Sequence, residues 1–154
     1  MIRFDGFTVK NGDKSFTLGA NINEVLGVLG LSAEKAVKVD EEMSYFSIDN
    51  VMLSILFGKC EFTFEDDRLI LIEYVPSLKE YVALYGGEAE MTRDDWYACV
   101  DEAYIYLYRY MLHMYPMDMV DGDGLELRRD EMTLTVSKER EEEGIAVILE
   151  ENLC

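Results

Sequence analysis

Residues that could perform catalysis are few in this chain and form no recognisable arrangement. His113 is the only histidine, which excludes a histidine-based triad and a metal site with several histidine ligands. A helical projection places His113 on a polar face, where Glu102 is too distant along the helix to orient it as a general base. Cys99 has no neighbouring cation in the sequence to lower its pKa. Neither side chain therefore predicts a nucleophile or a general base.

An acidic segment near residue 120 resembles part of a calcium-binding loop. It contains Asp118, Asp121, Gly122, Asp123 and Gly124. If Gly124 occupied the sixth position of an EF-hand loop, Met119 would stand at the first ligand position and Asp130 at the twelfth, where a glutamate is needed. The pattern favours an ordinary Asp/Gly turn, and cation binding by these aspartates is left open.

The remaining sequence motifs do not indicate a reaction. Carboxylate pairs such as Asp94-Asp95 are frequent, but an acidic composition alone produces them. The signatures GxxxxGK[ST], GxGxxG, GxSxG and HExxH are absent. We therefore expect a protein that is not an enzyme and that carries no cofactor or metal.

The charge balance is the most unusual property of the chain. Fourteen Lys and Arg residues stand against 32 Asp and Glu residues, a formal net charge of −18. Such a charge repels nucleic acids and anionic membranes and attracts basic proteins, although a generically acidic protein would show it too. The three cysteines have no CxxC spacing, and no signal peptide or membrane-length apolar run is evident, so we expect a cytoplasmic protein.

The element that must position most of the distinctive side chains is a helix predicted over residues 92–115. Thr92 can cap its first turn with Asp95 as the capping-box partner, and Pro116 ends it because proline lacks an N–H. Apolar side chains recur at steps of three and four and predict the core-facing stripe: Trp96, Val100, Ala103, Leu107, Met111 and Met114. We expect this aromatic-rich helix to be the central scaffold.

Six of the ten tyrosines lie on the same helix, on both flanks of the apolar stripe. Tyrosine is enriched at protein interfaces because its ring is apolar while its hydroxyl remains hydrated. We therefore predict partner contacts from these tyrosines and from an acidic run: Tyr97, Tyr104, Tyr106, Tyr108, Tyr110, Glu65, Asp66 and Asp67. The alternative is that the tyrosines line the rim of the protein's own core.

The rest of the chain alternates short strands with turns. Residues 2–19 predict a β-hairpin around Asn11-Gly12, with an earlier turn at Asp5-Gly6, and residues 21–30 predict a short capped helix. Other expected elements are strands at 45–48, 52–57, 60–64, 69–75, 125–127, 132–136 and 145–149, turns at Gly58-Lys59 and residues 65–67, a short helix after Pro76, and a turn-rich loop over residues 117–124. This pattern predicts a single α+β domain over residues 1–154, with an antiparallel or mixed β-sheet and about three helices.

Part of this layout resembles a known class of bacterial proteins. The stretch FTLGANINEVLGVLGL and the strand-rich YFSIDNVMLSILFGKCEFTFEDDRLILIEY, together within residues 16–75, are similar to small acidic α+β immunity proteins of toxin systems, including contact-dependent inhibition. The resemblance implies a cytoplasmic inhibitor that binds one toxin domain, and many such toxins are basic nucleases. It transfers no binding residues.

Charge and resemblance together predict an acidic, non-catalytic protein that neutralises a basic partner, most specifically a bacterial toxin. Two alternatives stay open. One is a nucleic-acid-mimicking inhibitor of a defence nuclease, and the other is a small-molecule-binding protein or enzyme with a pocket beside helix 92–115.

Overall fold

Eleven strands and three α-helices build the part of the chain that the computed structural model describes, residues 1–84, 86–115, 119–122, 124–139 and 144–152. The strands are β1 (Ile2–Phe4), β2 (Val9–Asn11), β3 (Lys14–Phe16), β4 (Val37–Lys38), β5 (Met43–Leu53), β6 (Leu56–Glu65), β7 (Arg68–Pro76), β8 (Met119–Gly122), β9 (Gly124–Arg129), β10 (Met132–Glu139) and β11 (Gly144–Glu151). The helices are α1 (Ile22–Leu29), α2 (Lys79–Ala83) and α3 (Arg93–Met114), with short 3-10 turns η1 (Ala33–Lys35) and η2 (Glu88–Glu90). The predicted α+β class is confirmed.

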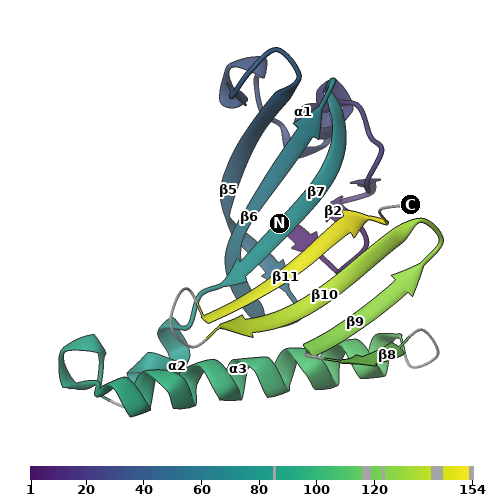
Figure 1. Cartoon of the computed structure of the whole chain (residues 1–154). Helices are drawn as coiled ribbons and strands as arrows, with labels where there is room; N and C mark the ends of the chain where they lie inside the picture. The colour runs from purple at the N-terminus through teal and green to yellow at the C-terminus, as the bar shows by residue number, and fades with distance from the viewer. Residues whose placement is uncertain (85, 116–118, 123, 140–143, 153–154) are drawn as a thin grey trace.

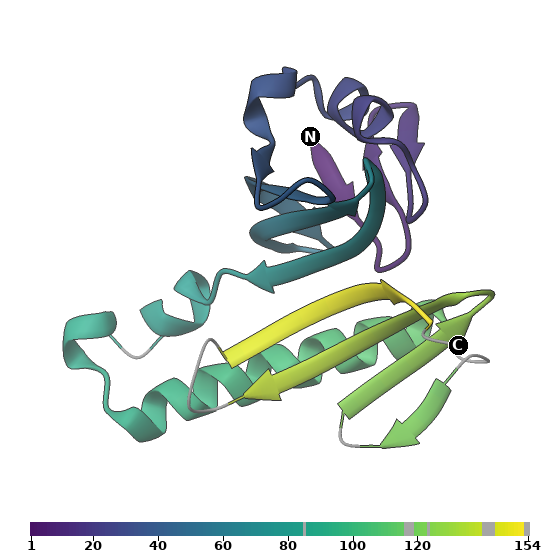
Figure 2. The same cartoon turned by 45° about the horizontal axis from the view of Figure 1, so that its top comes forward.

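All strands belong to one mixed sheet. Its order is β3-β2-β1-β5-β6-β7-β11-β10-β9-β8, and β4 is added to β5. Only β1 and β5 are parallel; the other neighbouring strands run antiparallel. The sheet is strongly curled, and α1 and α3 lie toward opposite ends of it (Figure 1). Helix α3 packs along one face of β10 and β11 (Figure 2).

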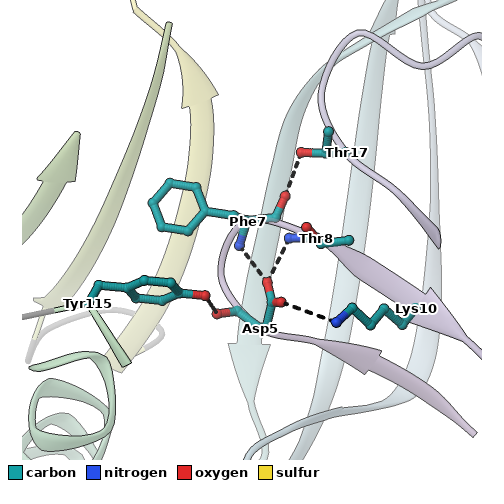
Figure 3. A network of polar contacts seen from close by, with 6 residues as sticks. All are labelled: Asp5, Phe7, Thr8, Lys10, Thr17 and Tyr115. Carbon is teal, nitrogen blue, oxygen red and sulfur yellow. Dashed lines mark hydrogen bonds and ion pairs between the residues drawn. The ribbon is translucent and has the colours of Figure 1, made fainter. Parts of the chain in front are cut away.

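The N-terminal turn closes the curled sheet onto the end of α3 (Figure 3). Asp5 Oδ1 accepts hydrogen bonds from the backbone amides of Phe7 (2.9 Å) and Thr8 (2.7 Å), while the Tyr115 hydroxyl donates to the Asp5 carbonyl (3.0 Å). The rings of Phe7 and Tyr115 meet edge to face at 5.0 Å, and the Arg129 guanidinium lies 4.8 Å from both ring centroids. Residues far apart in the sequence are thus joined at one corner, and the predicted hairpin becomes three short strands that use both expected turns.

Helix α3 carries the predicted stripe with one error at its end. The Thr92–Asp95 capping box is present, and the helix buries Cys99, Val100, Ala103, Leu107 and Met111. Met114, predicted as a core residue, is 43% exposed, and Tyr115 is buried in its place. The helix ends at Met114, and the N-terminal turn provides the contacts for Tyr115 just beyond it.

The strand region differs from the prediction in two turns. Gly58 lies inside β6 instead of in a turn. The neighbouring strand β7 leaves no room for a side chain there, because a Cβ would lie 2.5 Å from the Val75 carbonyl oxygen and 2.7 and 2.8 Å from ring atoms of Tyr74. The chain reverses earlier, between Leu53 and Leu56, so the strand predicted over 52–57 is wrong: its first residues continue β5 and its last residues begin β6. Strand β8 also occupies part of the segment expected as a loop, residues 117–124. The turn at residues 65–67 and the asparagine-capped α1 are confirmed.

Candidate protein-binding surface

Two acidic turns lie side by side at the end of β5, β6 and β7 that points away from α3 (Figure 1). The turn between β4 and β5 contains Asp40, Glu41 and Glu42, and the turn between β6 and β7 contains Asp66 and Asp67 after Glu65. The register of β5 against β6 pairs Met43 with Glu65 and so brings the two turns together. The backbone amide of Asp66 donates a hydrogen bond of 2.8 Å to the Glu42 carbonyl. We call these six residues the acidic pole.

The first turn is held by one of its own carboxylates. Asp40 Oδ1 accepts hydrogen bonds from the backbone amides of Glu42 (2.8 Å) and Met43 (2.7 Å). These two bonds, the one from Met43 first, lower the pKa of Asp40 because they stabilise its ionised form. Asp40 therefore stays charged at neutral pH and fixes the turn that presents Glu41 and Glu42.

The second turn is a two-residue hairpin loop with left-handed backbone. Asp66 and Asp67 have φ of 51° and 62°, as a type I′ turn requires, and aspartate is one of the few side chains that accept this conformation. The carbonyl of Asp67 accepts a hydrogen bond of 2.8 Å from the amide of Ile22, at the start of α1. Hydrogen bonds of the backbone therefore anchor both turns.

The acidic pole brings six carboxylate side chains to one end of the sheet. All six residues are exposed, and no ion pair within 4.0 Å involves their side chains among the residues that the structure describes. Arg68, the cation next in the chain, pairs with Glu151 at 2.5 Å instead. Within the described ranges, no three His, Cys, Asp or Glu side chains are grouped closely enough to hold a metal ion. The surface is suited to cationic side chains of another molecule.

The predicted tyrosines lie elsewhere, along the border between α3 and the sheet. The hydroxyls of Tyr106 and Ser54 share a hydrogen bond of 2.6 Å, which ties α3 to the turn between β5 and β6. Burial, followed by the nearby Asp5 charge, raises the pKa of Tyr110. On this flank of the helix, both tyrosines are partly buried against the protein's own core.

The opposite flank of α3 is also engaged with the sheet. The rings of Tyr104 and Tyr108 lie 6.1 Å apart, and the Lys138 ammonium sits 5.0 Å from the Tyr104 ring while bridging to Asp101 at 3.0 Å. Tyr97 is half-buried. The structure therefore does not bring the tyrosines onto one surface with Glu65, Asp66 and Asp67, because the β6–β7 turn lies at the end of the sheet that points away from α3 (Figure 1).

The residues considered for catalysis are not grouped. His113 is exposed on α3, and Cys99 is buried against the sheet. Burial, followed by the charges of Glu102 and Asp95, raises the pKa of Cys99, which disfavours its thiolate. The side chains of Asp118, Asp121 and Asp123 lie outside the described part of the structure.

The sequence predicts only half of the acidic pole, the run Glu65, Asp66 and Asp67. The charged and weakly patterned residues 33–43 predict a loop with room for a helical turn, so the sequence does not single out Asp40, Glu41 and Glu42 as a site. A signal was present in the run DEE directly before the alternating MSYFSI, because a turn followed by a strand indicates a hairpin. Its pairing with residues 65–67 depends on strand register, which spacing alone does not give.

None of the helices within the described ranges has the length and apolar character needed to cross a membrane. Comparison of the chain with protein-family models, with curated proteins and with solved structures gives no match.

Proposed function

We propose that this protein is an acidic, non-catalytic inhibitor that neutralises a basic protein partner in the cytoplasm, as immunity proteins of bacterial toxin systems do. The observation that carries the proposal is the acidic pole, six exposed carboxylates on two hydrogen-bonded turns without a neutralising cation in the described structure. The net charge of −18 makes the molecule as a whole strongly negative, so a basic protein is attracted to it from any side. The resemblance within residues 16–75 supports the toxin-inhibitor class.

The exposed carboxylates of the acidic pole can promote binding of a basic protein in three ways. A concentrated negative surface accelerates the approach of a basic protein and disfavours acidic competitors. Because backbone hydrogen bonds already hold both turns, binding loses little conformational entropy in ordering them. If the partner is a nuclease, the carboxylates occupy the basic groove that would otherwise hold its phosphate backbone.

A small-molecule-binding role is the second candidate, because a hollow of about 620 Å³ lies beside the start of α3. Leu78, Val82, Ala83 and Trp96 give it an apolar lining, and Ser77 and Lys79 supply the polar side chains at its border. A ligand there would be mainly apolar with an anionic group near Lys79. The hollow has few convergent polar groups, so the acidic pole carries the stronger case.

The test compares two variants that lose the same number of charges. One variant neutralises the pole through Glu41→Gln, Glu42→Gln, Glu65→Gln, Asp66→Asn and Asp67→Asn. The control variant neutralises five other exposed acids through Asp13→Asn, Glu90→Gln, Asp94→Asn, Glu131→Gln and Glu150→Gln.

Each protein is immobilised and exposed to lysate of its source cells at low salt, and bound proteins are eluted with increasing salt and identified. The proposal expects wild type and the control variant to retain a basic protein that high salt releases. The variant that neutralises the acidic pole should not retain this protein. Equal retention by all three proteins, or retention of a small ligand that salt does not release, would contradict it.

A further inference from the structure

The β4–β5 hairpin, which carries the first acidic turn, exposes apolar side chains on its outer face. Val37 is paired with Tyr45, and the amide of Val39 donates a 2.9 Å hydrogen bond to the Met43 carbonyl, so these four residues follow one face in alternation. Val37, Val39 and Tyr45 are 49%, 65% and 37% exposed, and Met43 is half-buried.

The opposite face of β5 shows that this exposure is unusual. The alternating residues Ser44 and Phe46 are 5% and 1% exposed and face the core. A strand with one buried face ordinarily places polar side chains outward, whereas here a serine is buried and valines and a tyrosine meet the solvent. Exposed apolar groups gathered on one face typically mark an interaction site.

Charged side chains border this apolar face. Glu65 lies directly opposite Met43 on the neighbouring strand β6, and Asp40, Glu41 and Glu42 form the adjoining turn. An apolar centre with a charged margin is the usual anatomy of a protein–protein interface. A second copy of this chain does not suit the surface, because two molecules of charge −18 would bring their acidic poles together.

We propose that the outer face of the β4–β5 hairpin docks an extended basic segment of the partner protein, whose apolar side chains rest on Val37, Val39 and Tyr45 while its lysines or arginines reach the acidic pole. This inference rests on the proposed function and adds to it the place of docking and the chemistry of the docked segment. Charge steers the encounter, and apolar contact supplies part of the affinity. A partner segment in which lysines or arginines stand beside apolar residues fits both requirements, because a long cationic side chain can lay its stem along the apolar face and extend its charged end to the acidic pole.

The test uses three labelled peptides of equal length as probes, KVKVKVK, KSKSKSK and EVEVEVE, with the full chain. Binding is measured by fluorescence anisotropy at low and high salt. Two variants accompany the wild type: Val39→Ser in the docking face and Ile55→Ser as a matched control. Ile55 is also 65% exposed but lies in the turn between β5 and β6.

The inference expects KVKVKVK to bind several-fold more tightly than KSKSKSK and to lose affinity with salt, while EVEVEVE does not bind. Val39→Ser should weaken KVKVKVK about five- to tenfold, as loss of a buried apolar contact implies, and Ile55→Ser should leave it unchanged.

Equal affinity of the two lysine peptides, or equal effects of the two variants, would overturn the docking face and leave the electrostatic proposal intact. Absence of binding by either lysine peptide at low salt would contradict both. Binding of EVEVEVE as tight as that of KVKVKVK would contradict the role of charge both in the proposed function and in docking.

Discussion

The amide of Asp66 donates a hydrogen bond of 2.8 Å to the carbonyl of Glu42, and this one contact joins two acidic turns that lie more than twenty residues apart in the chain. Carboxylates on independent flexible loops would separate under their mutual repulsion. Here the backbone holds the two turns together, so their carboxylates share one surface to which a cationic partner can bind.

The β6–β7 turn should gain stability when its aspartates are replaced by the residues that type I′ turns prefer. The double substitution Asp66→Asn with Asp67→Gly keeps the left-handed backbone, removes the strain of a side chain at φ 62°, and removes two repelling charges. We expect the free energy of unfolding in urea to rise by about 0.5–1 kcal/mol. Capture of the basic partner should weaken at the same time. A less stable variant would show that the aspartates support the turn in a way that their charge and conformation do not explain.

Gly6→Ala should strongly destabilise the protein. Gly6 has φ of 105°, and a Cβ there would lie 2.7 Å from Leu134 Cδ2 and 3.3 Å from Met111 Cε, where the N-terminal turn meets α3 and β10. Strain and overpacking together predict a loss of about 2–5 kcal/mol in the free energy of unfolding.

Gly12→Ala is the matched control for Gly6→Ala. Gly12 also has positive φ, 66°, but no heavy atom lies within 4 Å of its added Cβ. Gly12→Ala should therefore lower the free energy of unfolding only by the cost of a side chain at positive φ, about 1–2 kcal/mol. Similar losses in both variants, measured by chemical denaturation, would mean that the N-terminal turn does not press against α3.

Tyr106→Phe tests whether this tyrosine serves the fold. Removal of its hydroxyl breaks the 2.6 Å hydrogen bond with Ser54, which predicts a loss of about 1 kcal/mol in stability. The double-mutant cycle with Ser54→Ala should give a coupling energy of similar size. Tyr108→Phe is the control, because no hydrogen bond of the Tyr108 hydroxyl is found in the described part of the chain. If Tyr106→Phe and Tyr108→Phe were equally neutral, Tyr106 would be available to a partner after all.

Tyr115 should make stability fall at alkaline pH. Burial, followed by the charge of Asp5, raises the pKa of Tyr115 to about 12, compared with about 10 for tyrosine in an unfolded chain. The folded state thus retains a proton that the unfolded state releases between about pH 10 and pH 12. The stabilising effect is complete below pH 10 and is lost as pH rises through the folded-state pKa.

Tyr115→Phe isolates this contribution. The variant loses the hydrogen bond to the Asp5 carbonyl, so it should be less stable than wild type at pH 8. The difference in unfolding free energy should narrow by about 1–2 kcal/mol between pH 10 and pH 12. Urea denaturation at fixed pH values measures it, and a constant difference across this range would show that Tyr115 ionises at an ordinary pKa.

Local patterns in the sequence were sufficient for α3, α1 and the acidic turn at residues 65–67, because caps, helical periodicity and turn residues act over a few positions. Gly58 shows where such reasoning fails. A glycine between apolar residues can indicate a turn or a place where another chain segment approaches closely. At Gly58 it is the close approach, because the Tyr74 ring on the neighbouring strand lies against this residue.

Long-range contacts explain the other errors. Met114 is exposed and Tyr115 buried because the N-terminal turn, more than a hundred residues earlier, supplies the neighbours of Tyr115. The candidate site also depends on a long-range contact. Glu65, Asp66 and Asp67 are visible as an acidic turn, but their union with Asp40, Glu41 and Glu42 depends on the β5–β6 register.

The central claim is that the acidic pole is the preferred cation-binding surface of the molecule. It is tested most directly by titrating the ¹⁵N-labelled full chain with tetralysine at low salt and following the backbone amide shifts. The account predicts the largest changes at residues 40–42 and 65–67, and their disappearance in the variant that neutralises five pole carboxylates. Shifts spread evenly over the exposed acids, including Asp94, Glu131 and Glu150, would contradict it.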